Sequence, residues 1–135
     1  MALEAWYDPD DDPISIRTTA DADALLDRMA ADGAGFEVPP LAELSRHDED
    51  GWAVSYIGVN VKSGRGIMTY SDPNGSATTS NGSHTGDTVT YDYMAHTREL
   101  PASAEIPLDD VRKAVREFVT IDNTRPTCVE WQAED

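Results

Sequence analysis

Alternation of apolar and polar residues, the pattern of a half-buried β-strand, recurs along this chain. It predicts strands at residues 3–7, 14–17, 52–61, 67–70, 88–95 and 127–131. The tight turn at 62–66 makes 52–61 and 67–70 a hairpin. Segment 36–44 contains Pro39-Pro40, so we expect an edge strand or an extended connection there, followed by a charged turn at 46–51.

Apolar residues spaced three and four apart predict two amphipathic helices. The first begins at Thr18 or Thr19 and ends near Gly33. The second begins at Pro107, a residue favoured at the first helical position, and its apolar stripe runs as far as Val119. Strands and helices together predict an α+β fold, an antiparallel sheet of about five to seven strands with the two helices packed on one face.

The length predicts one domain, spanning 1–135. Segment 73–87 is rich in Gly, Ser, Thr and Asn, and it predicts a flexible loop. That loop is longer than most connections, which makes it a candidate binding segment.

The net charge of the chain indicates the kind of partner that it binds. The chain has 26 acidic and 10 basic residues, a formal net charge of -16. Such a field attracts cationic surfaces and repels nucleic acid and anionic membranes, so we expect a basic protein partner, no direct nucleic-acid binding and no membrane association. Solubility or salt adaptation is the alternative explanation of the same charge. Short apolar runs, an acidic N-terminus and a single cysteine predict a cytoplasmic protein.

Catalytic and metal-binding patterns give no candidate site. His47, His84 and His96 are too scattered for a zinc site, and Cys128 has no neighbour that lowers its pKa. The acidic run at 8–12 lacks the ligand spacing of an EF-hand, and the chain has no nucleophile elbow or phosphate loop. We therefore predict no catalytic residue, no metal and no cofactor, and the chain is interpreted as a binding protein.

Candidate binding residues are the acidic and aromatic side chains that the strand pattern places at turns or on exposed faces. Tyr91 and Tyr93 share one side of a strand, where they belong either to the core or to an aromatic interface patch, and Asp92 takes the other side. For the tryptophans at positions 6, 52 and 131 we expect core packing. The candidate set is Asp8, Asp10, Asp11, Asp12, Asp92, Tyr93, Glu99 and Glu130.

The second half of the chain carries a specific series of motifs. They are Tyr91-Asp92-Tyr93-Met94, Glu99-Leu100-Pro101, Glu105-Ile106-Pro107-Leu108, the helix from Val111 to Phe118, and the segment from Arg125 to Trp131. This series resembles the actinobacterial immunity proteins of polymorphic toxin systems, in the Imm family numbered one. The N-terminal hairpin and the Asp-Ala-Leu-Leu-Asp-Arg segment are similar as well.

The resemblance implies an antitoxin that binds a cognate toxin domain and blocks its active site. Members of this family are often encoded beside nucleic-acid deaminase toxins, which use a zinc-activated water on a polyanionic substrate. An acidic protein would complement the basic entrance of such an enzyme. Two alternatives stay open: an acidic nucleic-acid mimic without a dedicated toxin, and a small enzyme whose site the sequence does not reveal.

Overall fold

In the residues that the structure describes, the fold consists of one large sheet, two α-helices, a short 3-10 helix and a separate hairpin. The computed structural model describes residues 3–48, 51–83, 85–120 and 125–133. The elements, in chain order, are β1 (Leu3–Trp6), β2 (Ile14–Ile16), α1 (Thr19–Gly33), β3 (Leu41–Asp48), β4 (Gly51–Asn60), β5 (Arg65–Asp72), β6 (Gly75–Thr79), β7 (Thr88–Tyr93), β8 (His96–Pro101), the short 3-10 helix η1 (Ala102–Ala104), β9 (Ile106–Pro107), α2 (Leu108–Thr120) and β10 (Trp131–Ala133).

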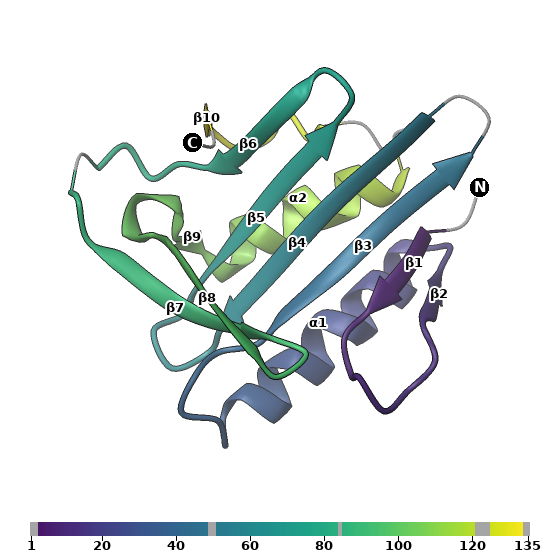
Figure 1. Ribbon diagram of the computed structural model, residues 1–135, viewed down its shortest axis with the longest axis horizontal. Helices are drawn as coiled ribbons and strands as arrows, with labels where there is room; N and C mark the ends of the chain where they lie inside the picture. The colour runs from purple at the N-terminus through teal and green to yellow at the C-terminus, as the bar shows by residue number, and fades with distance from the viewer. Residues whose placement is uncertain (1–2, 49–50, 84, 121–124, 134–135) are drawn as a thin grey trace.

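The large sheet has eight strands in the order β10-β6-β5-β4-β3-β1-β2, with β9 added beside β5. All pairings between these strands are antiparallel. The helices α1 and α2 cover one face, and the two-stranded β7–β8 hairpin crosses the other (Figure 1). The predicted α+β fold with both helices on one face is confirmed, with more strands than expected.

Local signals in the sequence explain where α1 begins. Thr18 is its N-cap: the Asp21 backbone N–H donates to the Thr18 hydroxyl at 3.2 Å, and the Thr18 N–H donates to the Asp21 carboxylate at 3.2 Å. This capping box satisfies two amides that the first turn leaves without helical partners. No helix in the described part of the chain is long and apolar enough to cross a membrane.

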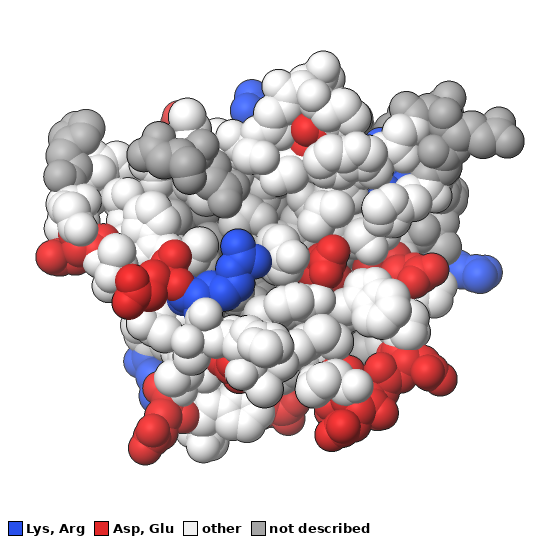
Figure 2. Space-filling model, in the orientation of Figure 1, with Lys and Arg blue, Asp and Glu red and all other residues white. Residues whose placement is uncertain are grey.

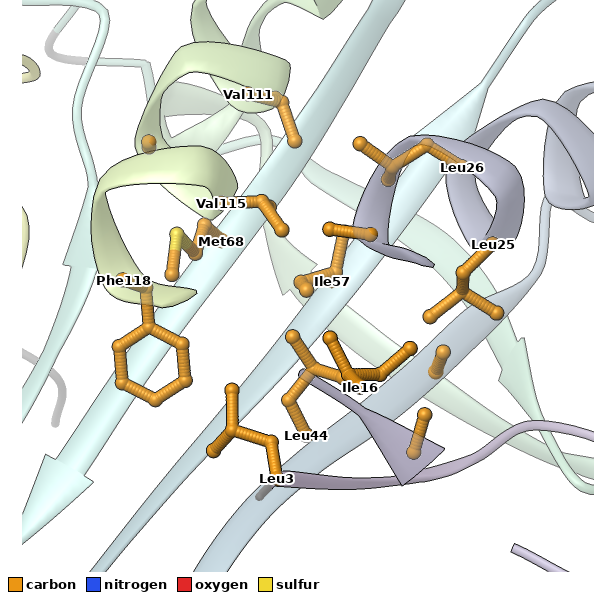
Figure 3. Packing of buried hydrophobic residues seen from close by; sticks show 14 of the residues in the cluster. Leu3, Ile16, Leu25, Leu26, Leu44, Ile57, Met68, Val111, Val115 and Phe118 are labelled. Atoms are coloured by element: carbon orange, nitrogen blue, oxygen red, sulfur yellow. The ribbon is translucent and has the colours of Figure 1, made fainter. Parts of the chain in front are cut away.

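The main core lies between the helices and the large sheet. Ile57 and Met68 point from the sheet toward Val115 and Phe118 of α2, and all four side chains are fully buried (Figure 3). At the rim of this layer Arg112 forms ion pairs with Asp23 at 3.1 Å and Asp27 at 2.8 Å. These pairs join α2 to α1 over the core.

The expectation of an edge strand at 36–44 was wrong. Strand β3 begins after Pro39-Pro40 and lies between β1 and β4 near the middle of the sheet. The prolines precede the strand, so they do not interrupt its hydrogen bonding. Arg46 and His47, expected in a charged turn, belong to β3, and residues 49–50 lie outside the described part.

Other boundaries also differ from expectation. Strand β6 occupies part of the segment 73–87 that the sequence predicted as a loop, and β8 was not predicted at all. The final strand, expected at 127–131, begins only at Trp131.

Candidate functional site

The face of the large sheet that the helices leave uncovered carries aromatic and polar side chains, and we call it the outer face. Along β4, Ala53 and Ile57 pack into the core beneath the helices, whereas Trp52, Val54 and Tyr56 alternate with them toward the outer face. Figure 2 views this side. Acidic side chains lie on the left, on the right and along the lower part of this view, uncharged side chains fill much of the surface between them, and basic ones are sparse.

Two tryptophans of the outer face are exposed, contrary to the expectation of core packing. Trp6 has 36% and Trp52 38% of its surface accessible. Strand pairing sets Trp6 opposite Glu43, and Trp52 opposite His47. Exposed tryptophans are typical of protein interfaces, where the indole offers a large apolar surface and a hydrogen-bond donor.

The third tryptophan behaves as the sequence indicated. Trp131 is half-buried and packs against the main core, and its indole N–H donates to the Pro126 carbonyl at 2.7 Å. The Arg125 guanidinium lies 5.9 Å from the centre of its ring.

Tyr91 fixes the β7–β8 hairpin to the outer face. Its side chain is fully buried, and its ring lies so close to Gly58 that a Cβ atom there would come within 2.6 Å of Tyr91 Cε2. Its hydroxyl donates to Glu105 at 2.7 Å. Burial first, and then the Glu105 carboxylate, raises the pKa of Tyr91 above its ordinary value. The core alternative is therefore correct for Tyr91.

Tyr93 joins the hairpin to the neighbouring strands. It is half-buried, its hydroxyl donates to Glu43 at 2.8 Å, and its ring meets Tyr56 edge to face at 5.3 Å between centroids. The guanidinium of Arg98, on β8, lies over the Tyr56 ring, 4.6 Å from its centroid. Burial, followed by Glu43, raises the pKa of Tyr93. These contacts orient Glu43 on the outer face beside Trp6.

The tip of the hairpin has an unusual backbone for its residues. Met94 and Ala95 form the two-residue connection, with φ of 49° and 72°. A two-residue type I′ turn requires positive φ at both positions and favours Asn-Gly. Residues with a Cβ carry a cost of roughly 1–2 kcal/mol in this region.

The acidic turn between β1 and β2 is held by one arginine of α1. Arg28 lies 3.6 Å from Asp8, 3.3 Å from Asp11 and 3.7 Å from Asp32. The Asp8 carboxylate also accepts the backbone N–H of Asp10 at 2.9 Å. The turn therefore presents acidic side chains around a single arginine.

A pocket of about 180 Å³ brings two of the predicted binding residues together. Asp8 enters it from the β1–β2 turn and Asp92 from β7, although the two are distant in sequence. The backbone N–H of Asp92 donates to the Pro39 carbonyl at 2.9 Å, which docks the hairpin beside the start of β3. The lining residues are Tyr7, Asp8, Pro9, Asp32, Phe36, Pro40, Leu41, Asp92, Met94 and Ala95.

The remaining candidates are dispersed. Asp10, Asp11 and Asp12 are exposed in the β1–β2 turn, and Glu99 is exposed on β8. Glu130 is exposed just before β10, at the opposite edge of the large sheet from the turn. The structure thus brings Asp8 and Asp92 together, places Glu99 on the same hairpin, and leaves Glu130 apart.

Several residues of this surface escaped the sequence prediction, namely Trp6, Trp52, Phe36 and Glu43. Alternation assigned Trp52 to one side of β4, but both sides of that strand carry apolar residues, so the pattern did not tell which side the helices cover. Phe36 is 45% exposed after the end of α1, a position that no periodicity describes.

The single cysteine and the metal-binding side chains add no candidate centre within the described residues. The Cys128 residue is exposed, but its thiol is partly desolvated and lies near the Glu117 carboxylate. Desolvation first, and then Glu117, raises the pKa of the thiol, which disfavours the thiolate. Across residues 3–48, 51–83, 85–120 and 125–133, no three His, Cys, Asp or Glu side chains form a group that fits a metal ion.

Comparison with known proteins places the chain in a family. The sequence model of the family described as immunity protein Imm1 matches residues 10–133, nearly the whole chain. No curated protein matches the sequence. The match includes the β1–β2 turn from Asp10 onward, both helices and the β7–β8 hairpin. The chain therefore belongs to the immunity protein Imm1 family.

Proposed function

We propose that this immunity protein neutralises its cognate toxin by laying the outer face over the toxin's active site. The observation that carries this proposal is the pair of exposed tryptophans, Trp6 and Trp52, on a face whose neighbouring side chains include Glu4 and Glu43. In known interfaces, buried aromatic side chains supply much of the binding free energy, and surrounding polar groups exclude water.

The toxin that fits best acts on nucleic acid, and a zinc-dependent deaminase is the proposed class. An enzyme of this kind must admit a base and the phosphates next to it, so its entrance is basic. An acidic surface with apolar anchors complements such an entrance in charge and in desolvation. Inhibition then needs binding alone, without catalysis, a cofactor or direct contact with nucleic acid, and it takes place in the cytoplasm.

Co-expression tests the proposal. A candidate toxin domain taken from a gene next to the one for this chain is expressed with and without the full immunity chain. Purified toxin is then titrated with the protein while deamination of single-stranded DNA is measured. We expect rescue of growth and complete inhibition at equimolar protein. Growth arrest despite soluble immunity protein would overturn the proposal.

Two substitutions test the face. Trp6→Ala and Trp52→Ala are each expected to raise the Kd for the toxin at least about tenfold, because a central aromatic anchor is removed. Lys113→Ala, on the exposed side of α2, serves as the control and should leave the Kd unchanged. Equal affinity in all three variants would move the interface away from the outer face.

Unrelated basic proteins separate the proposal from general nucleic-acid mimicry. A mimic would bind a histone or another DNA-binding protein as tightly as the toxin, because only charge is read. The aromatic anchors predict a preference for the cognate toxin of at least about a hundredfold.

A further inference from the structure

The pocket between the β1–β2 turn and the hairpin tip has walls from four separate segments. Tyr7 and Asp8 follow β1, Asp32 and Phe36 lie at the end of α1, Pro40 precedes β3, and the hairpin closes the remaining side. We propose that this pocket receives an arginine side chain of the toxin. The inference rests on the proposed function and deepens it, because it names the chemistry that the immunity protein recognises.

The volume argues for a side chain and against a metabolite. Small-molecule sites usually have cavities of roughly 300–1,000 Å³, enclosed on most sides. This pocket has about 180 Å³ and opens at the surface. One long side chain from a partner protein matches that size.

Apolar groups in the walls match the stem and the planar head of arginine. Pro40, Leu41 and Met94 offer contacts to the methylene groups. Phe36 is 45% exposed and presents an aromatic side chain to the pocket, on which a guanidinium can stack. Arginine is favoured over lysine at such a site because its head is planar and weakly hydrated.

The charge of the lining selects a cation. Asp8, Asp32 and Asp92 contribute carboxylates, and the described residues that line the pocket include no lysine or arginine. Arg28 lies 3.6 Å from Asp8 and 3.7 Å from Asp32, with its guanidinium 4.9 Å from the centre of the Tyr7 ring, so it offsets part of the charge of these two carboxylates. Asp92 has no such pair among the described residues. A guanidinium would form two charge-assisted hydrogen bonds with one carboxylate in bidentate geometry.

Asp92 is the carboxylate that we expect to accept the hydrogen bonds of the guanidinium. Within the described part of the chain its carboxylate forms no hydrogen bond or ion pair, and its side chain is half-buried at the pocket wall. Its backbone is fixed by the hydrogen bond to Pro39. A half-buried carboxylate without a partner gains more from a bound cation than a fully solvated one does.

The pocket can be tested without the toxin. N-acetyl-arginine amide is titrated into the isotope-labelled full chain, and backbone amide shifts are followed by NMR; N-acetyl-citrulline amide, neutral and of the same shape, is the matched control. We expect saturable shifts at Phe36, Asp92 and Met94 with roughly millimolar affinity for the arginine compound, and none for citrulline. Asp92→Asn should abolish these shifts, and Asp12→Asn, which removes one charge from the nearby turn without lining the pocket, should preserve them. Shifts elsewhere, or equal shifts with citrulline, would overturn the inference.

The toxin complex provides the second test. Asp92→Asn and Asp8→Asn should each raise the Kd for the catalytically inactive toxin domain about tenfold, and Asp12→Asn less than about twofold. Wild-type binding with unchanged Kd in the Asp92 and Asp8 variants would reject the arginine pocket and leave the proposed function intact. Absence of wild-type binding would reject the proposed function, and the NMR titration would still decide the pocket.

Discussion

At the scale of residues, tyrosine hydroxyls use several of the acidic side chains inside the fold. Each of these hydroxyls donates to a carboxylate at 2.7–2.8 Å, which fixes the carboxylate in one orientation. The pairs are Tyr7 with Asp32, Tyr70 with Asp72, Tyr91 with Glu105 and Tyr93 with Glu43. Some of the acidic side chains therefore stabilise the fold. Tyr93 positions Glu43 at the outer face, and Tyr7 positions Asp32 at the pocket.

Alkaline pH should expose the contribution of Tyr70. Burial, followed by Asp72, raises its pKa from 10.0 to about 12, so the folded state retains a proton that the unfolded state has lost. Its stabilisation is complete below pH 10 and is lost as the pH rises through about 12. Urea denaturation across this range should show falling stability, with a shallower fall in Tyr70→Phe. An identical slope in the variant would contradict the assignment.

Gly58 is expected to be intolerant of any side chain. A Cβ atom there would lie 2.6 Å from the Tyr91 ring, and the ring is buried and cannot move aside. Gly58→Ala should lower the free energy of unfolding by about 1–3 kcal/mol, the usual cost of overpacking. Gly86 has open space around it, so Gly86→Ala should change the free energy of unfolding by less than about 0.5 kcal/mol. Thermal denaturation of both variants measures these changes. Equal stability of the two variants would show that the hairpin does not pack on β4 as described.

At the scale of elements, the β7–β8 hairpin combines rigid docking with a strained tip. Tyr91 anchors its middle in a small second core with Leu41 and Ile67. Met94 and Ala95 have positive φ angles, which are unfavourable for residues with a Cβ atom, and both line the pocket. Strain of this kind often accompanies a binding surface.

Relaxing the tip should separate stability from binding. The double substitution Met94→Asn with Ala95→Gly gives the turn its preferred residues, and thermal denaturation should show a gain of about 1 kcal/mol or more. The same change removes the Met94 wall, so the Kd for the toxin should rise. A variant that binds unchanged would exclude the tip from the interface, and a loss of stability would contradict the turn assignment.

The sequence predicted those elements whose signals are local. The Thr18 capping box and the helical spacing of apolar residues marked α1, and alternation marked β4 and β7. Strand β8 was missed because its six residues, HTRELP, mix charges with a proline and lack alternation. It forms because β7 supplies a pairing partner along its whole length.

The candidate site was predictable only in part, for a related reason. An acidic turn is visible in a sequence, and Asp8 was named on that basis. Asp92 was named because strand alternation sets it on the side opposite Tyr91 and Tyr93. Their proximity depends on the bridge between Pro40 and Asp92, a tertiary contact without a sequence signature. The exposure of Trp6 likewise depends on the hairpin covering one part of the outer face and leaving the rest bare.

At the scale of the whole molecule, the net charge of -16 sets how partners approach. Ion pairs with Arg28, Arg112 and Arg116 neutralise some carboxylates of α1 and the β1–β2 turn. The remaining negative field is long-ranged at low salt and is screened within about 10 Å at 0.1 M ionic strength.

Association with the toxin should therefore depend on salt. Stopped-flow measurements are expected to show an association rate constant at least about tenfold lower at 0.5 M than at 0.02 M salt, with a much smaller change in dissociation. An association rate constant that does not change with salt would mean that the negative charge serves solubility and does not steer binding.

Oxidative footprinting of the complex shows, side chain by side chain, whether the outer face covers the toxin. Hydroxyl-radical labelling with mass spectrometry is applied to the full chain, free and bound to the inactive toxin domain. Protection is predicted at Trp6, Trp52 and Met94. Cys128 and Trp131, near the β10 edge of the large sheet, should be labelled equally in the free and the bound state. Unchanged labelling of the two exposed tryptophans, with protection at Cys128 and Trp131, would contradict the account.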